Sequence, residues 1–292
     1  MGYADALVFG LSRGSEKMGV DLAKVCQEIT VQAVSFLERR GPVFYASLPV
    51  APETLKGCRT NGAGDQQRLV SSLWDHLVAL MAREIPPGKG GHASNRAAVP
   101  IQVVHDPLGR PHLRLGENRG PAISCSEGGG KIWAALCGDE SDIGIDVAET
   151  DEFQGEYPVH RVFHGHELHH ALRLAGGDLA RASALLWSVK EAVAKALGCA
   201  FHLVSPRQIN VYPAVGRDGG YTFPVSLSGK ALVRFPLNPG RSIWVRSLPR
   251  AKMWLSIALL NRQIDEAMGG SGLCAGSGLA ATRKPAHRQV HS

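Results

Sequence analysis

Hydrophobic positions in the first 97 residues follow two different spacings. Apolar residues recur at helical spacing over 19–40 and over 65–84, which predicts two helices. Between them, the apolar run 43–50 is rich in β-branched and aromatic residues and predicts a strand. Residues 85–97 combine Pro, Gly and polar residues and predict a loop.

From residue 99 onward, short strands dominate the pattern. Strands are predicted at 99–106, 121–126, 131–138, 141–149, 208–212, 221–227, 231–235, 242–248 and 252–260. Only Asp139 and Glu140 separate the third strand from the fourth, so these two are expected to form a hairpin. Helices are predicted at 165–175 and 179–198. The pattern is typical of an α+β protein rather than of alternating βαβ units.

The order of strand, helix and strands occurs twice, which is compatible with a duplicated structure. We expect two similar α+β halves at 41–138 and 139–265, preceded by a helical extension at 1–40. Residues 266–292 are mostly small and polar, which predicts a disordered tail.

Composition narrows the protein class. No apolar run reaches the roughly 18 residues that a transmembrane helix needs, and the first residues do not resemble a secretory signal. The six cysteines are scattered without a CxxC pair, which favours neither zinc nor disulfides. A cytoplasmic protein without a membrane partner is therefore expected.

The net charge of +6 is unevenly distributed. Residues 139–191 contain 11 acids and 4 bases, whereas residues 192–292 contain 13 bases and 3 acids. The acidic block is either a solvated face or a cation site. The basic block could suit nucleic acid, a membrane surface or an acidic protein. Few aromatic residues accompany those bases, so nucleic acid is the least favoured partner.

Three segments carry residues suited to chemistry, GIDVAE (144–149), FHGHE (163–167) and WSVKEAVAKALG (187–198). Asp146 lies on a strand that reads as buried, where a carboxylate is costly unless it is paired or binds a cation. Glu191 and Lys195 are four residues apart and share a helical face. Each feature alone fits an ordinary salt bridge, but together the two acids could converge on one metal.

These segments resemble the motifs of the 4′-phosphopantetheinyl transferase superfamily. GIDVAE is similar to its (V/I)G(I/V)D motif, and FHGHE to its F-(S/T)-x-x-E helix start. WSVKEAVAKALG matches W-(T/S)-x-K-E-(A/S)-x-x-K-x-x-G at every fixed position. Weaker similarities are the GRP turn (109–111), ISCSEG (123–128) in place of a Ser-His-Ser strand, and DQQR (65–68).

The resemblance implies transfer of the phosphopantetheine arm of coenzyme A to a serine of an acyl or peptidyl carrier protein, with release of adenosine 3′,5′-bisphosphate. It implies the larger, duplicated class, with a monomeric chain and an active site between the halves. Mg²⁺ would be held by Asp146 and Glu191. Glu191, or a water that it orients, would accept the serine proton, and Lys195 would stabilise charge on the phosphoryl group.

The remaining expected contacts are with coenzyme A. Arg110 would bind the 3′-phosphate, Ser124 could add a hydrogen bond there, and Cys125 would lie near the nucleotide. Lys190 could hold a phosphate, and Arg68 could reach the nucleotide end. A non-catalytic relative that binds coenzyme A or a carrier protein is the alternative.

Two positions depart from the family pattern. Cys125 stands where the family has a histidine. Ala148 stands where many larger members have a second acid. Both changes favour weaker coenzyme A binding or a divergent role.

A different enzyme class is suggested by HELHH (166–170), which matches the zinc motif H-E-x-x-H. On a helix, His166 and His170 would share a face and Glu167 would be the general base, with Glu191 as a further ligand. The segment is rich in histidine and Gly165 places His166 in the first turn. Solvent-facing histidines are the simpler interpretation.

Overall fold

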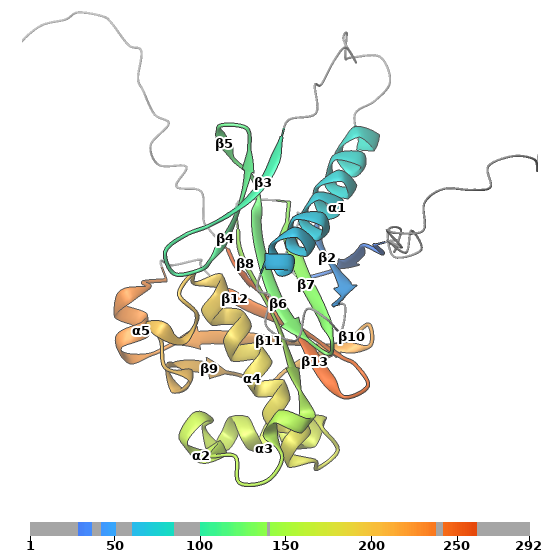
Figure 1. Ribbon diagram of the computed structural model, residues 1–292. Helices are drawn as coiled ribbons and strands as arrows, with labels where there is room; N and C mark the ends of the chain where they lie inside the picture. Colours follow the sequence, from blue (N-terminus) through green and yellow to red (C-terminus); the bar gives the residue numbers. More distant parts are fainter. Residues whose placement is uncertain are drawn as a thin grey trace, which may run out of the picture. The chain divides into compact units, whose positions relative to one another are not determined.

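The computed structural model describes residues 29–36, 42–50, 60–84, 100–138, 141–237 and 242–261. Its strands form two stacked sheets with helices packed on them, and a smaller three-stranded sheet lies beside them (Figure 1). No helix among these residues is both long and apolar enough to cross a membrane.

The first sheet is antiparallel and has the strand order β1-β2-β7-β6. Its strands are β1 (Gln32–Val34), β2 (Val43–Pro49), β6 (Ala122–Gly128) and β7 (Lys131–Cys137). Helix α1 (Thr60–Glu84) packs on one face through Leu69, Leu73 and Leu77. A separate ribbon contains β3 (Ile101–His105), β4 (Pro111–Leu115) and β5 (Asn118–Arg119).

The second sheet is also antiparallel and has the order β10-β11-β12-β13-β8, with β9 pairing β11. Its strands are β8 (Asp142–Glu149), β9 (Ile209–Val211), β10 (Val215–Arg217), β11 (Gly220–Leu227), β12 (Ile243–Pro249) and β13 (Met253–Leu260). Its α-helices are α2 (Val159–Val162), α3 (Gly165–Leu174), α4 (Leu179–Ala196) and α5 (Gly229–Arg234). Short 3₁₀ turns lie at η3 (Thr150–Phe153), η4 (Ala200–His202) and η5 (Pro206–Gln208).

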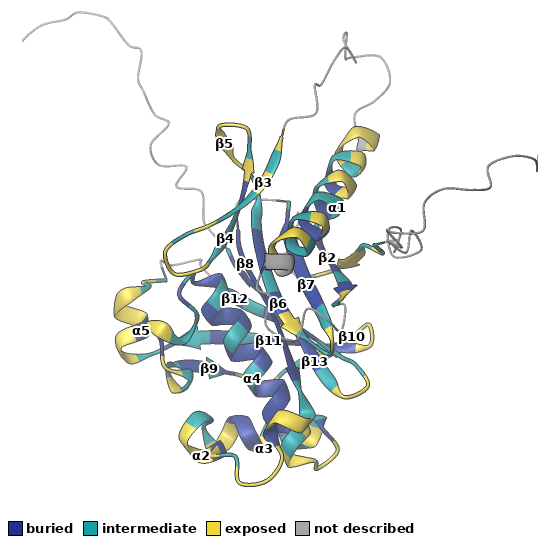
Figure 2. Ribbon diagram, in the orientation of Figure 1, coloured by how far each residue is buried: buried dark blue, intermediate teal, exposed yellow. Residues whose placement is uncertain are grey.

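The two sheets pack face to face, and each carries a helix on its outer face. Successive side chains of a strand point to opposite faces. In β2, Tyr45 therefore belongs to the core between the sheets, together with Ile145 and Ile257, while Phe44 belongs to the core under α1. Helix α4 covers the other face of β8 and β13, and Figure 2 shows these strands and the inner side of α4 as buried. Strand β8 is thus buried on both faces.

The structure confirms the α+β class and most of the expected elements. Three expectations are wrong. Residues 32–34 of the expected helix 19–40 form strand β1, and the expected strand 231–235 lies mostly in helix α5. The expected hairpin does not form either, because β7 pairs with β2 and β6 whereas β8 pairs with β13 in the other sheet.

Other expectations stay open. The tail 266–292, the loop 85–97 and most of the extension 1–40 lie outside the described residues. The limits of the two halves and their structural similarity stay predictions. Strands β4, β5 and β10 were not expected from the sequence.

Candidate functional site

Asp146 lies at the centre of a polar cluster between β8, β6 and α4. Its Oδ1 accepts hydrogen bonds from Lys195 Nζ at 2.7 Å and from Ser126 Oγ at 3.0 Å. Lys195 Nζ also donates to Ser126 Oγ at 3.1 Å and lies 3.8 Å from Glu191 Oε1. The structure therefore brings Asp146, Glu191 and Lys195 together in one cluster. The sequence motifs predicted that these three residues share a site.

Gly144 makes this cluster possible. A Cβ atom at Gly144 would lie only 1.9 Å from the carbonyl oxygen of Ala192. Helix α4 therefore packs directly on the backbone of β8, because glycine lets two backbones approach closely. Asp146 is two residues along the same strand face, so its carboxylate meets the side chains of α4.

The environment of Asp146 makes its carboxyl a weaker acid than usual. Burial raises the pKa of its carboxyl to about 7, against the lowering effect of Lys195, and the nearby charge of Glu191 adds to the rise. Its second oxygen, Oδ2, is buried and has no hydrogen-bond partner among the described residues. A buried polar atom without a partner is uncommon and suggests that a ligand completes the site.

The carboxylates of Asp146 and Glu191 suit Mg²⁺ better than zinc. Within the described part of the chain, no three His, Cys, Asp or Glu side chains gather around one point. An all-protein zinc site needs at least three such ligands. Mg²⁺ is usually held by one or two carboxylates together with waters and substrate phosphates. Asp146 and Glu191 fit this second pattern.

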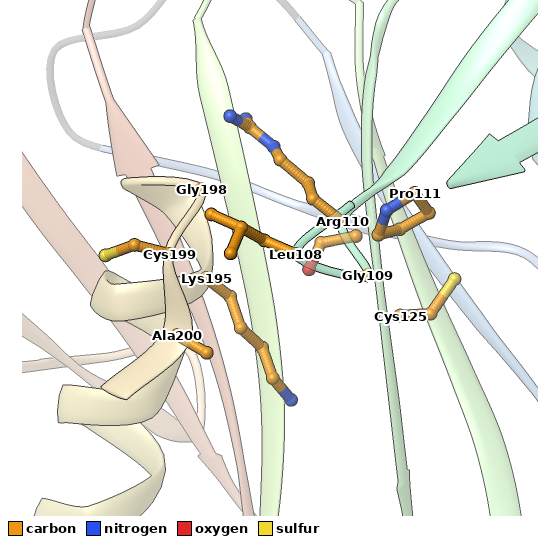
Figure 3. Close-up of a pocket in the computed structure, with 10 residues that line it drawn as sticks. Leu108, Gly109, Arg110, Pro111, Cys125, Lys195, Gly198, Cys199 and Ala200 are labelled. Atoms are coloured by element: carbon orange, nitrogen blue, oxygen red, sulfur yellow. The ribbon is translucent and has the colours of Figure 1, made fainter. Parts of the chain in front are cut away.

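A cavity of about 120 Å³ opens beside the cluster. Its wall contains Leu108, Gly109, Arg110, Pro111, Ser124, Cys125, Lys195, Gly198, Cys199 and Ala200. Figure 3 shows the turn before β4 facing the segment that follows α4. Residues of both predicted halves therefore line the cavity.

Arg110 is held tightly in this wall. Its Nη2 donates to Asp142 Oδ1 at 2.8 Å. Gly198 has a positive φ of 79°, and a Cβ atom there would lie 2.5 Å from Arg110 Nη1. The final glycine of the WSVKEAVAKALG motif is thus required both for the turn and for the approach of the guanidinium.

Ser124 and Cys125 line the same cavity on β6. Ser124 Oγ accepts a hydrogen bond from the backbone N–H of Ile145 at 3.1 Å, so it also links the two sheets. Burial raises the pKa of the Cys125 thiol to about 12. Cys125 is therefore neutral at physiological pH and supplies no positive charge.

Two expected contacts are not supported by the positions of the residues. Lys190 is fully buried, and its ammonium donates to both oxygens of Glu167 and to the carbonyls of Pro206 and Ile209. These bonds occupy its donors, so Lys190 is a structural residue rather than a phosphate ligand. Arg68 lies on α1, pairs with Asp65 at 3.5 Å and is absent from the cavity wall.

The zinc interpretation of HELHH does not fit the structure. Glu167, the expected general base, is buried and bound to Lys190 and to the backbone N–H of Val211. His170 Nε2 accepts a hydrogen bond from the backbone N–H of Ala214. Hence neither side chain is available for the roles that a zinc hydrolase requires.

Three contacts at the site were missed in the sequence. Ser126 shares a strand face with Ser124, and Asp142 shares one with Asp146, so strand periodicity could have indicated both. The contact of Gly198 with Arg110 joins distant segments, and no local signal reveals it.

Comparison with known proteins supports the motif assignment. Residues 142–223 match the family model ACPS, described as the 4′-phosphopantetheinyl transferase superfamily. A search of curated protein sequences finds no match.

Solved structures of two acyl-carrier-protein synthases show weak similarity. A Chronobacterium ammoniagenes ACPS–CoA complex is 21% identical with a TM-score of 0.35, over 43% of this chain and 100% of that chain. Holo-[acyl-carrier-protein] synthase from Neisseria meningitidis is 22% identical with a TM-score of 0.32, over 41% and 98%. These values are too low to add to the family match.

Proposed function

We propose that the protein is a Mg²⁺-dependent 4′-phosphopantetheinyl transferase of the holo-[acyl-carrier-protein] synthase type, because residues 142–223 match the family model of the 4′-phosphopantetheinyl transferase superfamily. It moves the phosphopantetheine arm of coenzyme A to a serine hydroxyl of an acyl or peptidyl carrier protein. In this reaction a bond forms between the serine oxygen and phosphorus. The bond between phosphorus and the oxygen of adenosine 3′,5′-bisphosphate breaks.

The observation that carries this proposal is the buried Asp146 beside Lys195 and the partly exposed Glu191. The Oδ2 atom of Asp146 has no partner among the described residues, while Lys195 occupies Oδ1. Asp146 and Glu191 would hold Mg²⁺ there. A bound Mg²⁺ supplies positive charge that neutralises the pyrophosphate of coenzyme A.

The side chains of the site have separate tasks in this proposal. Glu191 is partly exposed, so it can accept the serine proton directly or orient a water that does. The Lys195 ammonium stabilises negative charge on the transferring phosphoryl group. Positioning and charge neutralisation account for most of the catalysis of such transfers.

The cavity beside the cluster would receive the nucleotide end. A guanidinium such as that of Arg110 binds phosphate oxygens with two parallel hydrogen bonds. The cavity volume of about 120 Å³ is well below the several hundred Å³ typical of pockets for whole ligands. It therefore suits one end of coenzyme A, and the rest of the molecule extends towards Asp146.

The proposal includes the partner and setting expected from the sequence. The basic final third of the chain suits an acidic carrier protein. We propose a cytoplasmic monomer that acts in fatty-acid, polyketide or nonribosomal-peptide synthesis.

The test is incubation with coenzyme A, Mg²⁺ and a panel of apo carrier proteins, followed by intact mass measurement. A mass gain of one phosphopantetheine on a carrier serine is the expected result, and omission of Mg²⁺ should prevent it. Asp146→Ala should abolish the gain. A folded protein that modifies no carrier would contradict the proposal and favour a non-catalytic relative.

A further inference from the structure

Arg110 is held by an acid that none of the motifs contains. We propose that Asp142 is a positioning residue that fixes the Arg110 guanidinium in the cavity wall and so determines how tightly the 3′-phosphate of coenzyme A binds. This inference rests on the proposed function, since it takes coenzyme A as the ligand.

The ion pair between Arg110 and Asp142 joins two segments that are far apart in the sequence. Arg110 belongs to the turn before β4, and Asp142 is the first residue of β8. Their 2.8 Å contact is largely shielded from solvent, with the side chains 17% and 10% exposed. A second acid, Asp106, holds the backbone of the same turn by accepting from the N–H of Arg110 at 2.9 Å. The backbone and the side chain of Arg110 are therefore fixed by separate carboxylates.

Gly198 leaves room for the guanidinium on another side. The Nη1 atom of Arg110 lies so close to Gly198 that a side chain there would collide with it. The guanidinium thus lies between β8, where it is bound to Asp142, and the turn after α4, which it approaches closely. An arginine side chain has many rotamers, and a ligand that must order one loses affinity. An arginine that is already ordered binds phosphate without this loss.

The guanidinium keeps donors for a ligand while it binds Asp142. An arginine has five N–H donors arranged around a plane. One of them, on Nη2, donates to Asp142 Oδ1. Its other edges can present N–H groups to phosphate oxygens, because planar guanidinium groups bind anions on more than one side.

Strand β8 also relates this anchor to the reaction centre. Asp142 and Asp146 lie on the same face of β8, with Gly144 between them. Four residues of a strand span about 13 Å. One strand thus sets the separation between the Arg110 anchor and the acid pair, so the position of the 3′-phosphate influences where the pyrophosphate lies.

Asp142 could have the opposite effect if it only repelled the phosphate. Its charge would then weaken binding, and any substitution that removed the charge would strengthen it. Positioning predicts that loss of the oxygen acceptor weakens binding, and that asparagine, which keeps this oxygen, restores most of it.

The experiment measures the Kd of coenzyme A and of dephospho-coenzyme A by calorimetry, without a carrier protein. Asp142→Ala should raise the Kd of coenzyme A about tenfold, or about 1.4 kcal/mol, as expected for residues in direct contact. Dephospho-coenzyme A, which lacks the 3′-phosphate, should bind unchanged. Asp142→Asn should recover most of the lost affinity. In transfer assays, the KM for coenzyme A should rise in Asp142→Ala while kcat stays unchanged.

Two further variants sharpen the result. Arg110→Ala should weaken coenzyme A binding, and adding Asp142→Ala to it should have no further effect. Asp218→Asn is the matched control for Asp142→Asn. Asp218 also pairs with an arginine, at 3.1 Å from Arg217, but it is exposed and is not part of the cavity wall. Thermal unfolding of each variant shows whether it is folded, and Asp142→Asn provides the test if Asp142→Ala does not fold.

Several outcomes would overturn the inference. Tighter binding of coenzyme A by both Asp142 variants would show repulsion instead of positioning. An equal loss for both ligands would show a general structural role. If the wild-type protein transfers phosphopantetheine but Asp142→Ala binds coenzyme A normally, only this inference fails. If the wild type neither binds coenzyme A nor modifies a carrier, the proposed function fails with it.

Discussion

Asp146 should destabilise the metal-free protein at neutral pH, even though the proposed activity depends on it. Its side chain is only 5% exposed, and burial raises its pKa from 3.8 to about 7. In the unfolded chain the carboxyl ionises near its ordinary pKa of about 4. Asp146→Asn keeps an oxygen that can accept from Lys195 but removes the ionisable group. We therefore expect this variant to be more stable than the wild type at neutral pH.

The size of the effect follows from the two pKa values. Each tenfold change in proton affinity is worth about 1.36 kcal/mol, so a rise from 3.8 to about 7 corresponds to roughly 4 kcal/mol. The folded state holds the proton of Asp146 more tightly than the unfolded chain does, so protonation stabilises the fold. This contribution is fully present below about pH 4 and is lost as the pH rises to about 7. The melting temperature changes by about 2–4 °C per kcal/mol in a protein of this size. Asp146→Asn should thus melt roughly 10 °C above the wild type at about pH 8, and close to it at about pH 4.

The assay is thermal unfolding with a chelator present, over the range from about pH 4 to about pH 8. Glu191→Gln is a useful companion variant, because Glu191 raises the pKa of Asp146 and its removal should reduce the pH dependence. Mg²⁺ should stabilise the wild type and not Asp146→Asn. A difference in melting temperature that does not vary with pH, or an asparagine variant less stable at about pH 8, would refute the reasoning. Either result would mean that the ion pair with Lys195 outweighs burial.

Three other substitutions test separate parts of the site. Lys190→Met leaves the charge of Glu167 buried without its partner and should lower the free energy of unfolding by about 3–5 kcal/mol in urea titrations; a loss below about 1 kcal/mol would contradict the structural role. Gly198→Ala forces an alanine to a φ of 79° and against Arg110. It should lower the free energy of unfolding by at least about 1 kcal/mol and weaken coenzyme A binding in calorimetry. Normal binding would show that Gly198 does not influence how Arg110 binds coenzyme A. His166→Ala should leave transfer to a carrier largely intact in the mass assay, whereas loss of activity would revive the zinc interpretation.

The sequence predicted elements better than it predicted their partners. Strand β8 is buried on both faces because one face packs on α4 and the other on the first sheet. A strand buried on both sides has no polar face from which its neighbours can be inferred. Proximity along the chain therefore suggested a hairpin with β7, whereas tertiary packing pairs β8 with β13. The strand predicted at 231–235 was wrong for a related reason, since a short apolar run fits a strand and one turn of helix equally well.

The candidate site shows the same division. Glu191 and Lys195 are four residues apart on one helix, so their neighbourhood follows from local geometry. Their meeting with Asp146 was inferred from the family motifs, because Asp146 precedes Glu191 by 45 positions. The role of Lys190 could not be inferred from the motif. Its identity in the motif suggested a phosphate contact, but only the fold reveals that its side chain points to Glu167.

The charge of the cavity wall explains why Asp142 matters more here than it would beside a histidine. Cys125 stands where the superfamily motif has a histidine, and its thiol is neutral because burial raises its pKa to about 12. Ser124 is neutral too, and Lys195 donates to Asp146. Within the described cavity wall, Arg110 is therefore the cation best placed for a phosphate of the nucleotide. With one guanidinium to bind that phosphate, affinity depends on how firmly it is held; Asp142 holds it and Gly198 leaves room for it.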